Sequence, residues 1–274
     1  MLDEYYFDNI YIRHAVDEHP DDRDFTMHIH EQCEIYFFIS GNAEYLVEGS
    51  VYPLNEKSLL IMRPAEAHKA RIRGNGRYER YALNFPLSFA DFIDPEGMLI
   101  SAFTQRPLGK SNMFSAEELD MPLAERLFSQ MCSIGSDYER QLSVKTHLIT
   151  LLDMISRSYK LRGRSENTPR SNGERIVLYV NSRLFDDISV PELAKHFYLS
   201  PSQFGRLFRQ ATGAAPWEYI TKKRLTAAKE KLRNGFSAQQ AAESCGFGDY
   251  SSFYRAYTKH FGCSPTEKNK DCTS

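Results

Sequence analysis

The sequence has 274 residues, of which 42% are hydrophobic and 26% are charged. This is too long for one average domain and too apolar for a disordered chain, so we expect two packed units. The formal net charge is 34 − 36 = −2, which for the whole chain argues against a protein that coats a polyanion. No run approaches 18 uninterrupted apolar residues, and the acidic start MLDEYYFDN does not resemble a secretory signal. We therefore expect a cytoplasmic protein without a membrane partner.

The charge is distributed unevenly along the chain. Residues 174–274 contain 15 Lys and Arg against 10 Asp and Glu, a net charge of +5, which leaves 19 − 26 = −7 for residues 1–173. An acidic unit therefore precedes a basic one, and only the second unit has the sign of charge that attracts nucleic acid.

Short segments typical of β-strands follow one another between residues 25 and 85. They are IYFFIS, AEYLVEG, VYPL, SLLIMRP and YERYALNF, and glycine and proline separate them. Many short strands at this spacing predict a sandwich or a barrel. Residues 86–115 have the pattern of a mixed loop, so we predict a β domain over residues 1–115.

Two helices are expected next, at residues 116–133 and 137–161. The second has an apolar stripe at a period of 3.6, formed by Leu142, Ile149, Leu152 and Ile155. Such a stripe packs either into the core of the same domain or against a second copy of the chain. Because the β unit before it looks complete, we assign residues 116–161 to a helical dimerisation element.

The segment RGRSENTPRSNG, at residues 162–173, is the clearest linker in the chain. It has no large apolar residue and contains Pro169 and Gly173. The pattern of residues 174–274 is helical, which predicts a separate all-α domain.

The last hundred residues contain an internal repeat with an offset of 49 residues. Phe204-x-Arg206-x-Phe208-x4-Gly213-x2-Pro216 recurs as Phe253-x-Arg255-x-Tyr257-x4-Gly262-x2-Pro265. Five positions in thirteen repeat in register with one aromatic exchange, which predicts two copies of one supersecondary unit.

Each copy has the pattern of a helix-turn-helix. In the first, Ser200, Pro201 and Gln203 form a helix start signal, and Gly213 forms a stop signal. In the second, residues 238–245 form the short helix and Asp249 caps the next one. The residues expected on the exposed sides of the two second helices are Ser202, Gln203, Arg206, Arg209 and Gln210 in the first copy and Tyr250, Ser251, Tyr254, Arg255 and Thr258 in the second.

Exposed arginines on such helices indicate DNA binding. A helix fits the major groove, and an arginine can donate two hydrogen bonds to guanine. Between the copies, residues 217–233 predict a helix of about 25 Å, which can hold two recognition helices about one DNA turn apart. It carries or adjoins Lys222, Lys223, Arg224, Lys229, Lys231 and Arg233. Alone, these charges are typical of a solvated helix face, but the repeat favours a role near DNA.

Residues 174–265 resemble the AraC/XylS family of bacterial transcription regulators. The matching residues are Leu193-Ala194, Leu199-Ser200, Phe204-x-Arg206-Leu-Phe-Arg209, Gly213, Pro216, Tyr219-Ile220, Arg224-Leu225, Ala228, Leu232, Gly246-Phe247-x-Asp249-x-Ser251, Phe253-x-Arg255 and Gly262-x-Ser264-Pro265. The resemblance implies two helix-turn-helix motifs bridged by a long helix. It also implies base contacts by Ser202, Gly205 and Arg206 in the first motif and by Tyr250, Ser251, Tyr254 and Arg255 in the second, with Gln203 and Arg209 beside them.

The chain departs from this family in the second motif. Ala238 and Ala241 stand where the family usually has isoleucine, and each loss of such a side chain typically removes about 2 to 5 kcal/mol of packing. Either the second motif is looser than the first, or Phe236 and Tyr257 fill the space.

The acidic half contains His28-x-His30-x3-Glu34-x6-Gly41, a pattern similar to that of cupins. On one unbroken strand, these three side chains together with Tyr36 and Phe38 would point into one cavity. In the same cavity, Pro64-x3-His68 would supply a further imidazole from a facing strand. The resemblance implies a cupin-like, double-stranded β-helix barrel, and the same pattern is common in the sensing domains of AraC-type regulators.

Three interpretations of this cluster remain open. It lines the pocket for a small-molecule effector, for which the aromatic rings suit a sugar or a flat organic acid. Alternatively, His28, His30, Glu34 and His68 hold a divalent metal, or the histidines only close hydrogen bonds at the barrel mouth. Glu66 replaces the glycine usual in the second cupin motif, which argues against an intact four-ligand site.

We therefore expect a sequence-specific DNA-binding regulator that a small molecule controls, without catalytic residues and without a resident cofactor other than this metal. Its expected partners are double-stranded DNA, the effector, a second copy of the chain and RNA polymerase. Two other classes are a metal-dependent cupin enzyme fused to a DNA- or protein-binding helical module, and a protein-binding adaptor.

Overall fold

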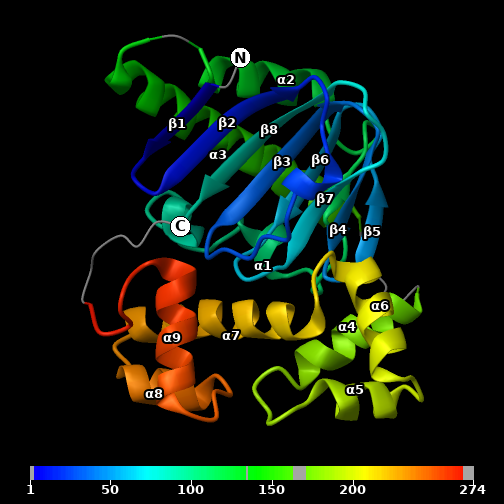
Figure 1. Cartoon of the computed structure of the whole chain (residues 1–274). Coiled ribbons are helices and arrows are strands. Elements are labelled where there is room, and N and C mark those ends of the chain that lie inside the picture. The colour runs from blue at the N-terminus through cyan, green and yellow to red at the C-terminus, as the bar shows by residue number, and fades with distance from the viewer. Residues whose placement is uncertain (1–2, 134, 163–170, 268–274) are drawn as a thin grey trace.

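The computed structural model describes residues 3–133, 135–162 and 171–267, so most of the predicted linker lies outside the described residues. The chain forms a β-rich half and a helical half, with one long helix lying beneath the barrel (Figure 1). This is the predicted fold class. Within the described residues, no helix is both long and apolar enough to span a bilayer.

Two antiparallel sheets build the β-rich half. The strands are β1 (Asp3–Phe7), β2 (Ile10–Asp17), β3 (Cys33–Ser40), β4 (Ala43–Val47), β5 (Ser50–Pro53), β6 (Ser58–Met62), β7 (His68–Ile72), β8 (Tyr78–Phe85) and β9 (Met113–Phe114). One sheet has the order β1-β2-β8-β3-β6-β9 and the other the order β5-β4-β7. The hairpin β1–β2 extends the first sheet before the point where the sequence pattern predicts the first strand.

Alternation along β3 separates two apolar cores. Tyr36 and Phe38 point into the space between the sheets, where they pack with Tyr45, Leu60 and Tyr78. The alternate residues of the strand, Ile35 and Phe37, point to the opposite side of the large sheet. The predicted common orientation of residues 34, 36 and 38 is therefore confirmed from Cys33 onward.

Helices α2 (Met121–Met131) and α3 (Asp137–Leu161) cover the outer side of the large sheet; the short α1 (Ser101–Thr104) packs against α3. The buried apolar side chains of α3 are Val144, Leu148, Leu151, Leu152 and Ile155. The buried face of the helix is rotated relative to the predicted apolar stripe, since Leu142 is exposed and Ile149 is only half-buried. This helix therefore completes the core of the β-rich half.

The helical half contains α4 (Asn172–Ser182), α5 (Val190–His196), α6 (Pro201–Thr212), α7 (Pro216–Arg233), α8 (Ala238–Ser244) and α9 (Tyr250–Phe261). Helix α4 begins at Asn172, inside the segment predicted as a linker. Ser200 and Gln203 form a reciprocal capping box at the start of α6, as the sequence predicts. The repeated glycines, Gly213 and Gly262, end α6 and α9 in the left-handed conformation, with φ of +82° and +70°.

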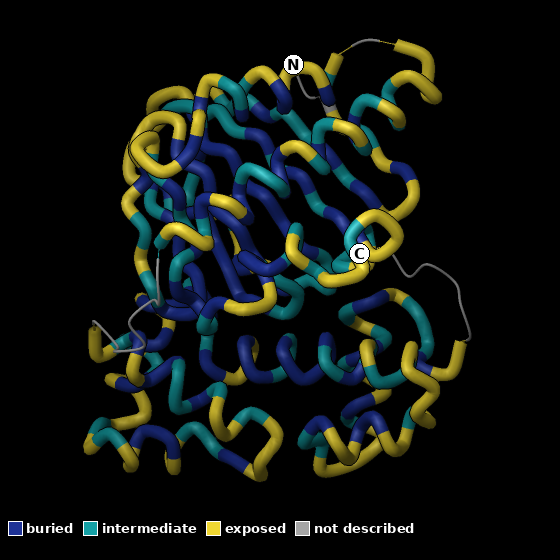
Figure 2. The backbone as a smooth tube through the Cα atoms, turned by 180° about the vertical axis from the view of Figure 1, so that it is seen from behind, coloured by how far each residue is buried: buried dark blue, intermediate teal, exposed yellow. Residues whose placement is uncertain are grey.

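The two helix-turn-helix motifs have cores of different composition. Phe204, Phe208 and Tyr219 pack in the first motif, and its core continues into the barrel through Met27 and Ile29. The core of the second motif uses Ala241, Ala242, Phe253, Tyr257 and Phe261. Tyr257 fills the space beside the alanines, whereas Phe236 remains 45% exposed. In Figure 2, the long helix beneath the barrel is largely buried or intermediate, whereas the outer helices and loops of the helical half carry many exposed segments.

Candidate effector cleft and DNA-binding surface

The residues predicted to read DNA lie on the outer sides of α6 and α9. Ser202, Arg206 and Arg209 are exposed on α6, where Gly205 is half-buried between them. The exposed residues of α9 are Tyr250, Ser251, Tyr254 and Arg255. These helices thus present polar side chains on one side and phenylalanines on the other, as major-groove recognition requires.

Two of the residues predicted to contact DNA also make hydrogen bonds within the protein. The side-chain oxygen of Gln203 accepts hydrogen bonds from the backbone N–H and the hydroxyl of Ser200, both at 3.0 Å. Arg255 donates to the Ser252 hydroxyl at 3.3 Å. Gln203 therefore fixes the start of α6, while Arg255 is oriented from within its own helix.

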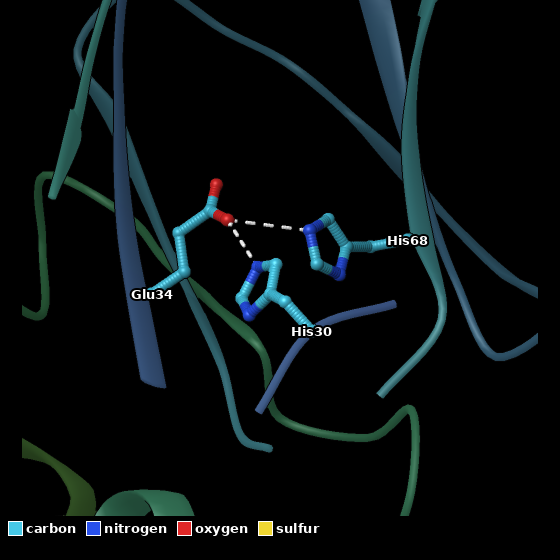
Figure 3. Close-up of side chains that lie close together, drawn as sticks. All are labelled: His30, Glu34 and His68. Atoms are coloured by element: carbon cyan, nitrogen blue, oxygen red, sulfur yellow. Dashed lines mark hydrogen bonds and ion pairs between the residues drawn. The ribbon is translucent and has the colours of Figure 1, made fainter. Parts of the chain in front are cut away.

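At the barrel mouth, His30, Glu34 and His68 converge (Figure 3). The Glu34 Oε2 atom lies 2.9 Å from His30 Nε2 and 3.2 Å from His68 Nε2. Glu34 and His68 are buried, and His30 is half-buried. Burial alone would raise the pKa of Glu34, but the two histidines hold that pKa well below its usual value. Burial opposes protonation of His68, yet the Glu34 carboxylate raises the pKa of His68.

His28 does not join this cluster, because the strand predicted to carry it is broken. Residues 29–32 are not in a strand, and His28 makes only an isolated bridge to His68 before β3 begins at Cys33. The two imidazole rings are 6.0 Å apart, and His28 is exposed. The alternation expected of one unbroken strand therefore holds for residues 34, 36 and 38 but does not extend back to residue 28.

Phe38 is also placed differently from the prediction, since it belongs to the closed core and does not line the cleft described below. Tyr36 does line this cleft, with its hydroxyl bonded to that of Tyr78.

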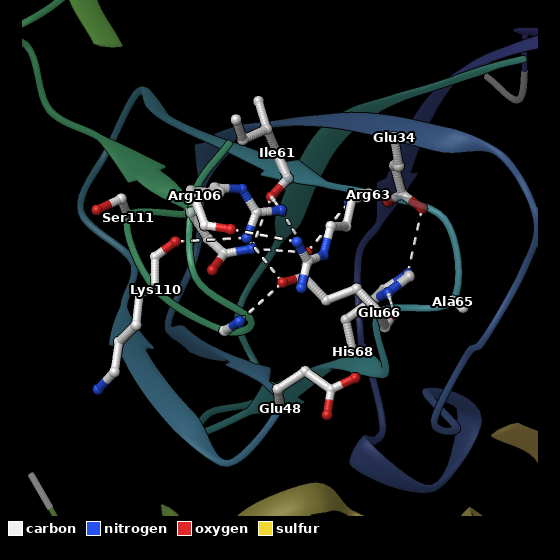
Figure 4. Close-up of polar contacts among 12 residues, drawn as sticks. Glu34, Glu48, Ile61, Arg63, Ala65, Glu66, His68, Arg106, Lys110 and Ser111 are labelled. Atoms are coloured by element: carbon white, nitrogen blue, oxygen red, sulfur yellow. Dashed lines mark hydrogen bonds and ion pairs between the residues drawn. The ribbon is translucent and has the colours of Figure 1, made fainter. Parts of the chain in front are cut away.

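Glu66 turns away from the three converging side chains (Figure 4). Its carboxylate forms a buried ion pair with Arg106 and accepts hydrogen bonds from the backbone N–H of Gly109 at 2.8 Å and of Arg63 at 3.1 Å. Burial alone would raise the pKa of Glu66, but Arg106 holds that pKa at about 2. The backbone oxygen of Glu66 accepts the Nδ1–H of His68 at 2.8 Å. Glu66 is therefore compatible with the His30–Glu34–His68 cluster, and its backbone oxygen orients the His68 ring.

A cleft of about 2250 Å³ separates the barrel mouth from the helical half. On one wall lie His28, His30, Glu34 and Tyr36. The other wall belongs to α7, α9 and their flanking loops and includes Lys222, Lys229, Arg233, Tyr257 and His260. Four of the six side chains predicted for the effector site therefore line one cleft, and both halves of the chain form it.

Most of the basic residues of α7 contact other parts of the protein. Lys223 lies 2.6 Å from Glu48 of the barrel and donates to the Ala65 carbonyl at 2.8 Å. The Arg224 guanidinium donates to the carbonyls of Leu184 and Asp186, each at 2.7 Å. At the far end of α7, Lys229 and Arg233 pair with Glu31. The barrel thus supplies acidic partners for several of these charges, and their role near DNA stays a prediction.

Glu48 is the central residue of this interface, and the sequence did not single it out. Its carboxylate accepts hydrogen bonds from the Tyr219 hydroxyl, from Asn181 Nδ2 at 2.9 Å and from the Ala67 N–H at 2.7 Å. Burial and the Glu48 charge raise the pKa of Tyr219 well above its usual value. The sequence offered one sign of Glu48, an acidic residue directly before a turn glycine, Gly49. In the structure, Glu48 has a φ of 48° in this turn.

Comparison with known proteins gives matches along the whole architecture. The AraC-like ligand binding domain matches residues 13–152, just over half of the chain, and the helix-turn-helix domain matches residues 193–271. The probable transcriptional regulator LumQ of Photobacterium leiognathi is 28% identical over 246 residues, covering 89% of this chain and 92% of the relative. The thermoregulatory protein LcrF of Yersinia pestis is 24% identical, covering 87% and 89%. Among solved structures, apo ToxT from Vibrio cholerae aligns with 12% identity and a TM-score of 0.41, covering 94% and 96%.

These matches agree with the two sites. The matched ligand-binding domain contains the barrel wall of the cleft, and the matched helix-turn-helix domain contains α6 and α9. The chain belongs to the AraC family of transcriptional regulators and combines a small-molecule-binding sensor with a DNA-binding domain of two helix-turn-helix motifs.

Proposed function

We propose that an effector bound in the cleft controls DNA binding by changing how the barrel rests on α7. The observation that carries this proposal is the shared lining, with Glu34 and Tyr36 on the barrel wall and Lys222 and Tyr257 on the helical wall. A ligand shifts an equilibrium between two arrangements only by binding one of them better. A molecule that touches both walls meets this condition, because separating the halves removes its contacts to one wall.

The lining favours a small polar molecule. Tyr36 offers an aromatic ring, while His30, Glu34 and Asn84 offer hydrogen-bonding groups close by. A sugar or a flat organic acid fits this combination, since ring faces bind apolar sugar faces or planar acids and the polar groups fix their orientation.

Ligand binding by variants of the two walls tests the proposal. A panel of sugars and aromatic acids is screened by thermal shift on the full chain, and the best ligand is titrated into Tyr36→Leu and Lys222→Met. We expect both substitutions to weaken binding about tenfold or more, as the loss of one good contact of about 1.4 kcal/mol would. Arg157→Ala, on the exposed surface of α3 and paired with Asp153, is the control. Unchanged affinity in Lys222→Met would reject a cleft shared by the two halves.

The rest of the proposal concerns partners. We propose that the chain acts in the cytoplasm as a homodimer, contacts RNA polymerase from its DNA site, and has no catalytic activity. The exposed Tyr138 and Leu142 on α3 support a second copy on that helix. The regulatory character of the curated relatives supports the absence of catalysis.

A further inference from the structure

Three electron-pair donors meet at one point of the barrel mouth. Glu34 Oε2, His30 Nε2 and His68 Nε2 all lie within 4.8 Å of one another. They come from different parts of the chain: the segment before β3, the strand β3 and the first residue of β7. Several elements therefore cooperate to bring together atoms that would repel one another unless a cation or a proton lay between them.

The positions of the ring protons follow from the other side of each imidazole. His30 Nδ1 lies 3.0 Å from the Gln32 carbonyl oxygen, and His68 Nδ1 lies 2.8 Å from the Glu66 carbonyl oxygen. A carbonyl can only accept, so in both rings Nδ1 carries the proton. The Nε2 atom of a neutral ring then directs its lone pair at the Glu34 carboxylate.

Asn84 supports this assignment. Its amide Nδ2 donates to His30 Nε2 at 3.3 Å and to Glu34 Oε2 at 3.2 Å. Tyr45 donates to the other oxygen of Glu34 at 3.4 Å. The carbonyl partners of the two Nδ1 atoms and the donors to Glu34 are the support that a histidine metal site uses, because such bonds fix the tautomer and the ring orientation. For an ion to bind, the Asn84 amide has to release His30 Nε2.

The separations fit a bound ion. Metal–ligand bonds of about 2.1 Å place neighbouring ligand atoms roughly 3.0 Å apart in octahedral and roughly 3.4 Å apart in tetrahedral geometry. The two separations from Glu34 Oε2 are 2.9 and 3.2 Å, and the third, between the two histidine ligand atoms, is within 4.8 Å. Two imidazoles and one carboxylate are a donor set for zinc and for neighbouring divalent transition metals.

We propose that His30, Glu34 and His68 bind one divalent transition-metal ion of the zinc type. His30 and Glu34 line the cleft, so the remaining coordination positions of the ion face the proposed effector. That role of the ion rests on the proposed function. The binding of the ion itself does not, so it is measured without effector and without DNA.

The full chain is stripped with a chelator and titrated with Zn²⁺, and with Co²⁺ as a spectroscopic probe, by calorimetry and visible absorption. We expect about one ion per chain, and a loss of about 100-fold or more in affinity in both His30→Ala and Glu34→Gln, since a ligand contributes more than the 10- to 100-fold of its supporting partners. In Glu34→Gln the size of the side chain is kept.

His14→Ala is the matched control. His14 Nε2 lies 2.9 Å from Glu79, and the ring stacks on Tyr81 with centroids 4.3 Å apart. This pair resembles His30–Glu34 but does not belong to the three-residue cluster, so the affinity for zinc should stay unchanged. Zinc should also raise the melting temperature of the wild type and of His14→Ala but not that of Glu34→Gln.

Two results would overturn the proposal. One is the absence of stoichiometric binding to the folded wild type, which would assign the cluster to a protonated histidine paired with Glu34. The other is full affinity in both His30→Ala and Glu34→Gln. Metal binding in a protein whose DNA affinity no effector changes would support this inference while rejecting the proposed function.

Discussion

Buried charges at single positions fix the shape of the barrel end. Glu66 and Arg106 are both fully buried, and Arg106 also donates to the carbonyls of Ile61 and Lys110, each at 3.3 Å. Asn112 donates to Glu66 at 3.1 Å. The network joins β6, the turn before β7 and the loop that leads to β9. It therefore holds in place the loop whose backbone positions His68.

Replacing Glu66 by glutamine should destabilise the protein by about 3 to 5 kcal/mol at pH 7, because it leaves the Arg106 charge buried without its counter-ion. The Glu66 pKa is about 2 in the folded chain and 4.5 when unperturbed. The unfolded chain therefore binds the proton first, and this contribution is present above pH 4.5 and is lost as the pH falls toward 2. Urea unfolding of the wild type and of Glu66→Gln at pH 7 and at pH 3 measures both effects.

Glu44→Gln is the control for this prediction. Glu44 pairs with Arg73 at 2.7 Å near the surface, so its replacement should cost no more than about 1 kcal/mol. Equal losses in the two variants, or a wild-type advantage over Glu66→Gln that does not shrink at pH 3, would contradict the account of the buried pair.

At the scale of the element, α6 and α9 are built alike. Each begins at a side-chain cap, buries two or more aromatic rings and ends at a glycine in the left-handed conformation. The two helices therefore hold Arg206 and Arg255 at equivalent positions, although the core behind α9 uses alanines where the core behind α6 continues into the barrel.

Arg206→Ala and Arg255→Ala should each weaken binding to the cognate site by about 1 to 3 kcal/mol, the effect expected if each arginine donates two hydrogen bonds to guanine as predicted. The duplex is selected from a random library by the full chain, and affinity is measured by fluorescence anisotropy at fixed salt. Arg157→Ala, which removes the same charge from the sensor half, should bind normally. Wild-type affinity in both recognition-helix variants would reject this readout.

Local sequence patterns predicted the helices and strands well, but they predicted contacts between residues far apart in the chain poorly. The capping pair of Ser200 and Gln203 lies within one turn, and the alternation of Glu34 and Tyr36 within one strand, so the sequence pattern determines both. The partner of Lys223 is Glu48, 175 residues away, and no periodicity indicates it. His28 lines the predicted cleft but stays outside the three-residue cluster for a related reason, because the strand is broken at residues 29–32 and the pattern contains no sign of that break.

At the scale of the whole molecule, the sensor and the DNA-binding domain share both a core and a set of ion pairs. Met27 and Ile29 of the barrel pack with Ile176 and Ile220, and Lys110 pairs with Glu174 of α4. The net charge of +5 over residues 174–274 is thus partly neutralised by the acidic sensor. Phosphate attraction is correspondingly modest, so under the proposed function the effector acts on the arrangement of the two recognition helices.

The central claim is that the contact between the barrel and α7 sets the affinity for DNA, and Glu48→Gln and Lys223→Met test it most directly. The measurement is the anisotropy titration of the selected duplex with the wild type, both single variants and the double variant. Lys57→Met combined with Glu125→Gln, an exposed pair 2.9 Å apart within the sensor, is the control. We predict that each single substitution changes DNA affinity about 5- to 150-fold in the same direction, and that the double variant changes it by less than the product of the two. Unchanged affinity in folded Glu48→Gln and Lys223→Met would contradict the claim.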